Sequence, residues 1–305
     1  MENYAGDLWH FPYVSFIFPI LTFNLNSRFT RMARIPLEDN YDDVVNKAQR
    51  GLGISDEDLA RRAEVSAEDL AALKSGAFNE AVARRVARHL KLHPDSLVQL
   101  AKKTWYPAQP VFPAGFAAFN TAYGDMTVNS YLVWDARSRH AAAFDTGADC
   151  GEMLEFLRAE RLALHYIFLT HTHEDHIADL PRLAGETRAG VWASEREPSG
   201  FPGARTFGEN THFHLGALTI KTLFTWGHSP GGTTYYITGL SHSLAIVGDS
   251  LFSCSMGGSR SAYAAALDNN FKKILPLPNN TVLACGHGPI TTVAQEKKNN
   301  PFFAR

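Results

Sequence analysis

The sequence predicts an α/β protein in which a small all-helical region precedes a layered domain of strands and helices. Two observations carry this prediction. Residues 36–104 contain capped helical patterns. After a segment that contains Pro107, Pro110 and Pro113, apolar strand-like runs alternate with helical runs, and such alternation indicates sheets layered with helices. We therefore divide the chain into an N-terminal extension (1–35), a helical domain (36–104), a linker (105–115) and a larger domain (116–305).

The N-terminal extension is predicted to be disordered or mis-annotated, with residues 1–31 translated upstream of a natural start at Met32. Its apolar stretch, 11–25, contains Pro12 and Pro19, and no Lys or Arg precedes it. The stretch therefore fits neither a secretory signal nor a membrane span. A poorly ordered tail and a weak signal peptide are the alternatives.

The helical domain is predicted to hold five short helices, over 40–49, 55–63, 67–74, 80–90 and 94–102. Ser55 and Ser66 are favourable N-cap residues. The pattern L-A-x-x-A-x-V-S, from Leu59 to Ser66, resembles the helix-turn-helix domains of the Xre/Cro repressors. In that family the second helix of the pair reads DNA bases with basic or amide side chains. Here that helix offers Glu68, Asp69 and only Lys74, so a packing or dimerisation module is favoured and DNA binding is the alternative.

The larger domain is predicted to contain strands and helices in alternation. The predicted strands cover 128–134, 141–144, 166–169, 191–193, 211–215, 218–224, 234–238, 243–247 and 281–285. The predicted helices cover 150–162, a segment from about 176, and 262–275.

Potential metal ligands gather where several of these strands end. The run from His171 to His176 reads H-x-H-x-D-H and follows an apolar strand. Downstream, His228, Asp249 and His287 each follow a strand, and each comes directly after a glycine. Neutral imidazoles and carboxylates are the ligands of hydrolytic metal sites.

The ordered motifs H-x-H-x-D-H, G-H-S-P-G, G-D-S and G-H-G-P resemble the metallo-β-lactamase superfamily, and the C-terminal run resembles its short glyoxalase-II-like (hydroxyacylglutathione hydrolase-like) branch. The resemblance covers about residues 115–305 and implies an αββα sandwich. It also implies two divalent metal ions, with zinc preferred and iron or manganese as alternatives. By the resemblance His171, His173 and His228 hold one metal, Asp175, His176 and His287 hold the second, and Asp249 bridges them.

Other polar residues near these motifs receive supporting or structural interpretations. His212 and His214 alternate along a strand and are interpreted as ordinary strand residues. Asp145, in F-D-T-G, is expected to support the site without binding metal. Ser229 is assigned to the loop, and Cys285 is expected to be a buried, inert thiol.

The resemblance implies a metal-dependent hydrolase that cleaves a thioester or related ester, with a metal-bridging hydroxide as nucleophile and Asp175 orienting it. A thiolate leaving group needs little protonation, because thiol pKa values lie near ~8.5. A mononuclear iron enzyme of the persulfide dioxygenase type is one alternative. A DNA-binding regulator with a metabolite-sensing metal domain is another.

Composition limits the partners and the compartment. The formal net charge is −2, so no global basic excess points to nucleic acid. The chain has 3 cysteines at wide spacing, which fits a reducing cytoplasm better than a disulfide framework. We expect a cytoplasmic enzyme with a small-molecule substrate and no membrane contact, with a homodimer through the helical domain as a further possibility.

Overall fold

The computed structural model describes residues 34–197 and 200–304, so the predicted extension lies almost wholly outside the described residues. Residues from Arg34 onward form one compact unit. Its helices are α2 (Tyr41–Leu52), α3 (Asp56–Ala63), α4 (Ala67–Lys74), α5 (Glu80–His89), α6 (Pro94–Ala101), α7 (Gly151–Ala159), α8 (Glu174–Ile177), α9 (Leu180–Thr187), α10 (Tyr263–Asn269) and α11 (Val293–Asn299). In the part of the chain described here, none of the helices has the length and apolar character needed to cross a bilayer.

The first five helices, with the segment 36–40 before them, are called the helical module here. Their predicted positions are confirmed to within about three residues. Ser55 and Ser66 accept hydrogen bonds from the backbone N–H groups of Asp58 and Asp69, which satisfies free donors at the starts of α3 and α4. Whether the module is a helix-turn-helix domain in function stays a prediction.

Two six-stranded sheets form the larger region, in the orders β1-β2-β3-β4-β5-β6 and β12-β11-β10-β9-β8-β7. The first sheet contains β1 (Phe116–Tyr123), β2 (Met126–Trp134), β3 (His140–Phe144), β4 (Ala163–Phe168), β5 (Gly190–Ser194) and β6 (Arg205–Phe207). The second contains β7 (His212–Leu215), β8 (Leu218–Phe224), β9 (Thr233–Thr238), β10 (Leu244–Gly248), β11 (Val282–Cys285) and β12 (Thr291–Thr292). The predicted pairing of the strands around 128–134 and 141–144 is confirmed as an antiparallel ladder.

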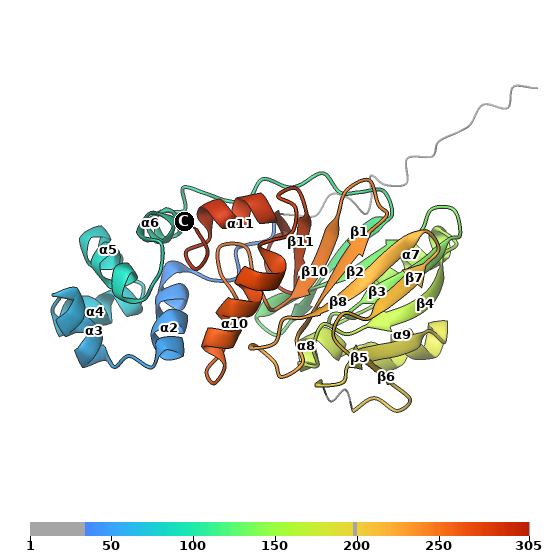
Figure 1. Cartoon of the computed structure of the whole chain (residues 1–305), viewed down its shortest axis with the longest axis horizontal. Coiled ribbons are helices and arrows are strands. Elements are labelled where there is room, and N and C mark those ends of the chain that lie inside the picture. The colour runs from blue at the N-terminus through green and yellow to red at the C-terminus, as the bar shows by residue number, and fades with distance from the viewer. Residues whose placement is uncertain (1–33, 198–199, 305) are drawn as a thin grey trace, which may run out of the picture. The chain divides into compact units, whose positions relative to one another are not determined.

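The sheets pack face to face through an aromatic and aliphatic core. Phe144 and Phe168 of the first sheet contact Tyr235 of the second, with ring centroids 5.2 and 5.1 Å apart. On the outer face of the first sheet, Phe156 of α7 contacts Phe119. Helices cover both outer faces, and the predicted αββα sandwich is confirmed (Figure 1).

A second core joins the outer face of the second sheet to α10, α11 and the helical module. Within this core α2 lies directly against α10. A Cβ added at Gly51 of α2 would stand 2.3 Å from the Tyr263 ring, so only glycine allows this approach. The helical module thus shares its apolar core with the sandwich.

Some elements differ from the sequence prediction. Strands β1, β6 and β12 and helix α11 were not predicted. The helix predicted over 262–275 is α-helical to Asn269 and continues as the π-helix η1 (Asn270–Ile274). The Asn270 side chain donates to the carbonyls of Ala266 and Ser250, and such competition with the helical ladder accounts for the change of helix type.

Candidate metal centre

The seven predicted ligands come from four strand ends. His171 to His176 follow β4 and open α8, while His228, Asp249 and His287 follow β8, β10 and β11. Because these ends lie at one edge of the sandwich, all seven side chains meet. Potential ligand atoms lie within 4.8 Å of one another in three groups: His171, His173, His228; His171, His176, Asp249; and Asp175, His176, His287.

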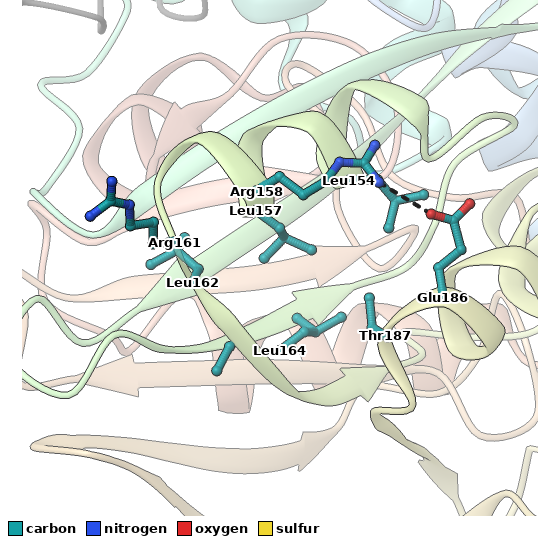
Figure 2. A pocket seen from close by; sticks show the side chains of 9 residues that line it. Leu154, Leu157, Arg158, Arg161, Leu162, Leu164, Glu186 and Thr187 are labelled. Carbon is teal, nitrogen blue, oxygen red and sulfur yellow. Dashed lines mark hydrogen bonds and ion pairs between the residues drawn. The ribbon is translucent and has the colours of Figure 1, made fainter.

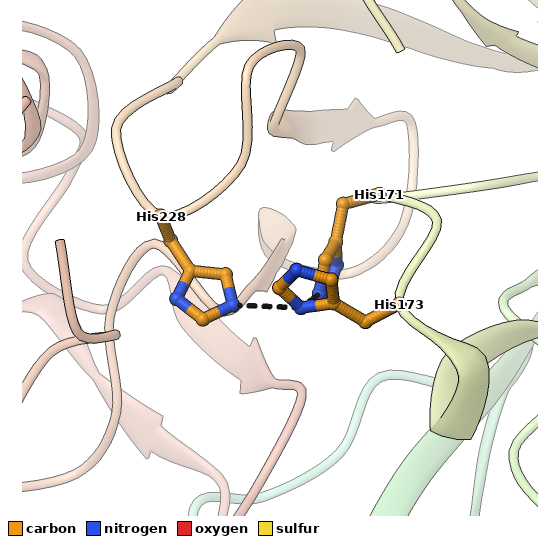
Figure 3. A group of neighbouring side chains, drawn as sticks. All are labelled: His171, His173 and His228. Atoms are coloured by element: carbon orange, nitrogen blue, oxygen red, sulfur yellow. Dashed lines mark hydrogen bonds between the residues drawn. The ribbon is translucent and has the colours of Figure 1, made fainter. Parts of the chain in front are cut away.

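The first group consists of three imidazoles. His173 Nδ1 lies 3.0 Å from His171 Nε2 and 3.0 Å from His228 Nε2 (Figure 3). His171 is buried, His173 is exposed, and the side chain of His228 is partly exposed. One ion could therefore contact all three nitrogens from a position at the mouth of the site.

The second group combines imidazoles with a carboxylate. Asp175 Oδ2 lies 3.1 Å from His287 Nε2 and 3.6 Å from His176 Nε2. All three residues are buried. This group is therefore deeper than the first and includes a carboxylate.

Asp249 lies between the two groups. Its Oδ2 is 3.3 Å from His228 Nε2 and 3.6 Å from His287 Nε2, and its Oδ1 is 3.3 Å from His176 Nε2. The carboxylate thus reaches nitrogens of both groups, as a bridging ligand must.

The hydrogen bonds behind four of the histidines fix which ring nitrogen faces the centre. The Nδ1 of His228 lies 2.9 Å from the Gly258 carbonyl, and the Nδ1 of His287 lies 2.8 Å from the Thr127 carbonyl. A carbonyl only accepts, so both Nδ1 atoms carry a proton, and the Nε2 atoms are the ring nitrogens that face the centre. The corresponding Nδ1 partners of His171 and His176 are Thr170 Oγ1 at 3.1 Å and Asp145 Oδ2 at 2.8 Å.

The converging atoms fit a cation. Lone pairs that face one another at hydrogen-bond distance repel unless a proton or a metal ion lies between them. Within the described residues, His176 Nε2 and Asp249 Oδ1 are buried without any hydrogen-bond partner, and such orphaned atoms are costly unless a ligand satisfies them. The mixed nitrogen and oxygen donors suit zinc, iron or manganese.

Two glycines keep the centre compact. A Cβ at Gly286 would lie 2.1 Å from Asp249 Oδ1, and one at Gly248 would lie 2.6 Å from Thr170 Oγ1. Gly248 also has a φ of 50°, which side chains disfavour. Because the residues before Asp249 and His287 are glycines, no side chain at these positions prevents the close approach of the candidate ligands.

The pKa values differ in direction between the two groups. Burial and the neighbouring His176 lower the pKa of His171 well below its ordinary value, and burial also lowers the pKa of His228. Burial opposes charge on His287 too, but Asp249 and a hydrogen bond to Asp175 outweigh it and raise the pKa of His287 to about 9. Burial therefore disfavours a proton on His171 and His228, whereas the second group is built around ion pairs.

Asp145 lies behind His176, where support was expected. Its φ of 56° is left-handed, and its carboxylate accepts hydrogen bonds from Thr170 N and Thr170 Oγ1, both at 2.7 Å. The same carboxylate accepts the Nδ1 proton of His176. A carboxylate in this position orients a ligating imidazole and increases its basicity.

Glu197 is a functional candidate that the sequence did not reveal. Its buried carboxylate accepts hydrogen bonds from Thr172 N and Thr172 Oγ1, both at 3.0 Å, and from Gly231 N at 2.7 Å. It therefore ties the H-x-H-x-D-H loop to the G-H-S-P-G loop. No motif marks Glu197, and its only sequence clue is an acidic residue in the segment after a predicted strand.

The remaining predicted residues lie outside the three ligand groups. His212 and His214 are exposed on β7, with Phe213 and Leu215 buried between and after them. Ser229 is buried in the loop beside His228, and its Oγ has no hydrogen-bond partner in the described part of the chain. Cys285 is fully buried, and burial raises the pKa of its thiol well above the ordinary value.

A separate surface hollow of about 410 Å³ lies between α7, β4 and α9 (Figure 2). Its floor is leucine, and Arg158 and Glu186 form an ion pair 3.3 Å long at its rim. None of the seven ligands lines it. Among the described residues, the candidate ligand groups therefore lie at the strand ends and not in this hollow.

Similarities to known proteins indicate the family of this chain. The sequence pattern of the metallo-beta-lactamase superfamily matches residues 123–287. A "probable metallo-hydrolase YqgX" of Bacillus subtilis is 27% identical over 202 residues, which cover 59% of this chain and 94% of that protein. The hydroxyacylglutathione hydrolase GloC of Haemophilus influenzae is 28% identical over 196 residues, which cover 57% of this chain and 92% of that protein. The crystal structure of the BLEG-1 B3 metallo-beta-lactamase is 28% identical, with a TM-score of 0.53, and the match covers 62% of this chain and 100% of that one.

Proposed function

This chain belongs to the metallo-beta-lactamase superfamily, and from that premise we propose that it is a dinuclear metal-dependent hydrolase of a thioester or related ester, similar to the hydroxyacylglutathione hydrolases. The observation that carries the proposal is the position of Asp249, whose two oxygens reach histidines of both ligand groups. A carboxylate that reaches histidines of two separate groups is suited to bridge two ions.

The proposal assigns each ligand a place. His171, His173 and His228 hold one ion, Asp175, His176 and His287 hold the other, and Asp249 bridges them. When bound, two divalent cations supply a water of lowered pKa as nucleophile and polarise the carbonyl of the substrate. Zinc is the preferred metal within the proposal.

The side chains of this chain then have three tasks. Asp145, Gly258 and Thr127 hold the imidazole rings so that their lone pairs face inward. Asp175, whose Oδ2 faces His287, orients the attacking water with its other oxygen. A thiolate leaves without a general acid because its conjugate acid has a pKa near ~8.5.

Two alternatives receive less support from the geometry. A mononuclear iron dioxygenase needs one metal ion with open coordination positions. Here Asp175, His176 and His287 form a second buried group that could hold another ion. A DNA-binding regulator needs basic side chains on α4. The exposed acids there are Glu68 and Asp69, and Lys74 is paired with Asp56.

The test is turnover of a hydroxyacylglutathione thioester, followed by thiol release, with the purified full chain. We expect turnover that chelation abolishes and divalent zinc restores. Oxygen uptake with a glutathione persulfide, or thiol release that persists after chelation, would contradict the proposal. Salt-dependent binding of duplex DNA would favour the regulator. A cytoplasmic location and a dimer through the helical module stay predictions.

A further inference from the structure

We propose that the helical module is part of the metal centre, because Lys47 of α2 positions His228 and Glu38, just before α2, lies beside His287. The inference rests on the proposed function, since it needs these histidines to hold metal. It assigns the module a task in metal binding that is independent of any contact with DNA.

Lys47 is a nearly buried cation with fixed partners. Its side chain is 16% exposed, and its Nζ lies 2.5 Å from Asp39 Oδ2 and 3.1 Å from the Met256 carbonyl. The ammonium also lies 5.3 Å from the centre of the Phe252 ring. An ammonium group removed from water is retained only with such partners, so Lys47 is held tightly against the loop that contains Met256.

That loop continues directly to the metal ligands. Gly257 N donates to the backbone carbonyl of Asp249 at 3.1 Å, and the Gly258 carbonyl accepts the Nδ1 proton of His228 at 2.9 Å. A Cβ at Gly257 would lie 2.0 Å from the Asp249 carbonyl oxygen and 2.9 Å from His228 Nδ1. Since the loop passes this close, a shift of Met256 moves the hydrogen-bond acceptor that orients His228.

The module reaches the second ligand group as well. Glu38 Oε2 lies 4.0 Å from His287 Nδ1. The Phe252 ring beneath Lys47 contacts the His287 ring edge-on, with centroids 5.6 Å apart. The helical module therefore places one charged side chain against the loop that orients His228 and another beside His287.

A module that only packs against the sandwich would have a different consequence. Loss of Lys47 would then lower the stability of the metal-free protein and leave the affinity for metal unchanged. Loss of a residue that positions a ligand lowers the affinity itself, in general by about 10–100-fold.

The experiment compares Lys47→Met with wild type and with Lys298→Met, a control at an exposed position of α11. Methionine keeps the length of the stem and removes the ammonium. A double variant, Lys47→Met with Asp39→Asn, removes both charges and so leaves no lone buried carboxylate. Zinc affinity is measured by competition with a chromophoric chelator, cobalt-substituted protein gives the ligand-field spectrum, and thermal unfolding reports the metal-free fold.

We expect one of the two ions to bind about tenfold more weakly in both Lys47 variants, with a changed cobalt spectrum and no change in Lys298→Met. For Glu38→Gln we expect a change of about threefold at the other ion, against none for the exposed control Glu57→Gln. Affinities within twofold of wild type and an unchanged spectrum for the Lys47 variants would overturn the inference alone. A wild-type chain that binds no metal would overturn the proposed function and this inference with it.

Discussion

The two ligand groups differ in charge and in what holds them. His171, His173 and His228 form a group of three imidazoles without a carboxylate of their own, and the ring of His228 is positioned by the Gly258 carbonyl. His176 and His287 are buried among carboxylates, and Asp145 holds His176 directly. Three imidazoles and the shared Asp249 would bind the first ion, whereas Asp175 adds a further carboxylate at the second. A change in a supporting carboxylate should therefore affect one group more than the other.

Asp249→Ala should have the largest effect, because the Asp249 carboxylate contacts both groups. We expect turnover to fall more than 100-fold, beyond the range of about 10–100-fold typical of supporting residues. Metal analysis and thiol release measure the two consequences. Asp125→Ala, in the exposed turn between β1 and β2, is the matched control and should behave as wild type. Two ions retained in Asp249→Ala would show that the groups are independent.

Asp145→Asn should weaken the second group selectively. Asparagine tolerates the left-handed backbone at this position, so the change removes charge without straining the turn. We expect the ion at His176 to bind about 30-fold more weakly, within the usual range for such carboxylates. Competition with a chelator resolves the two binding steps. If both ions bound more weakly to the same extent, Asp145 would not distinguish the two ligand groups.

Glu197→Gln should weaken the first group selectively, by about tenfold. The glutamine amide nitrogen cannot accept a hydrogen bond, so either Thr172 or Gly231 loses its partner and the loops of His171, His173 and His228 loosen. Glu195→Gln, at an exposed neighbouring position, is the control. The same competition experiment would count against this assignment if the second ion, and not the first, were released more easily.

Glu296→Gln should leave metal binding nearly unchanged and alter the pH dependence of stability. Burial raises the pKa of Glu296 to about 7, against hydrogen bonds from Asn300 and Thr291 that lower it. The folded state therefore binds the proton more tightly than the unfolded state, and wild-type stability should fall by about 3 kcal/mol as pH rises from 4.5 through 7. Urea unfolding at several pH values should show a weaker decline in the glutamine variant. If stability declined equally with pH in both proteins, titratable groups other than Glu296 would cause the decline.

The sequence predicted the strongly patterned elements and missed the weakly patterned ones. Helices α3 and α4 begin with N-cap residues and strand β10 is an apolar run, and these local patterns predicted the elements correctly. Strand β1 reads F-A-A-F-N-T-A-Y, and its alanines and asparagine give no clear period. Strands β6 and β12 have three and two residues, too few for any period to show.

The candidate ligands could be proposed from the sequence, and most of the residues that support them could not. The seven candidates follow strands in recognisable motifs, and the family resemblance of these motifs divided them into two groups. Glu197 and Lys47 act through tertiary contacts with residues far away in sequence, such as Gly231 and Met256. The Gly258 carbonyl is a backbone group that any residue could supply, and therefore no sequence pattern marks it.

The most direct test of the central claim is a zinc titration of the full chain with His173→Ala and His287→Ala measured beside wild type. The account predicts about two ions per wild-type chain and about one in each variant, because each variant disables a different group. One ion per wild-type chain, lost in His173→Ala and kept in His287→Ala, would contradict a dinuclear centre.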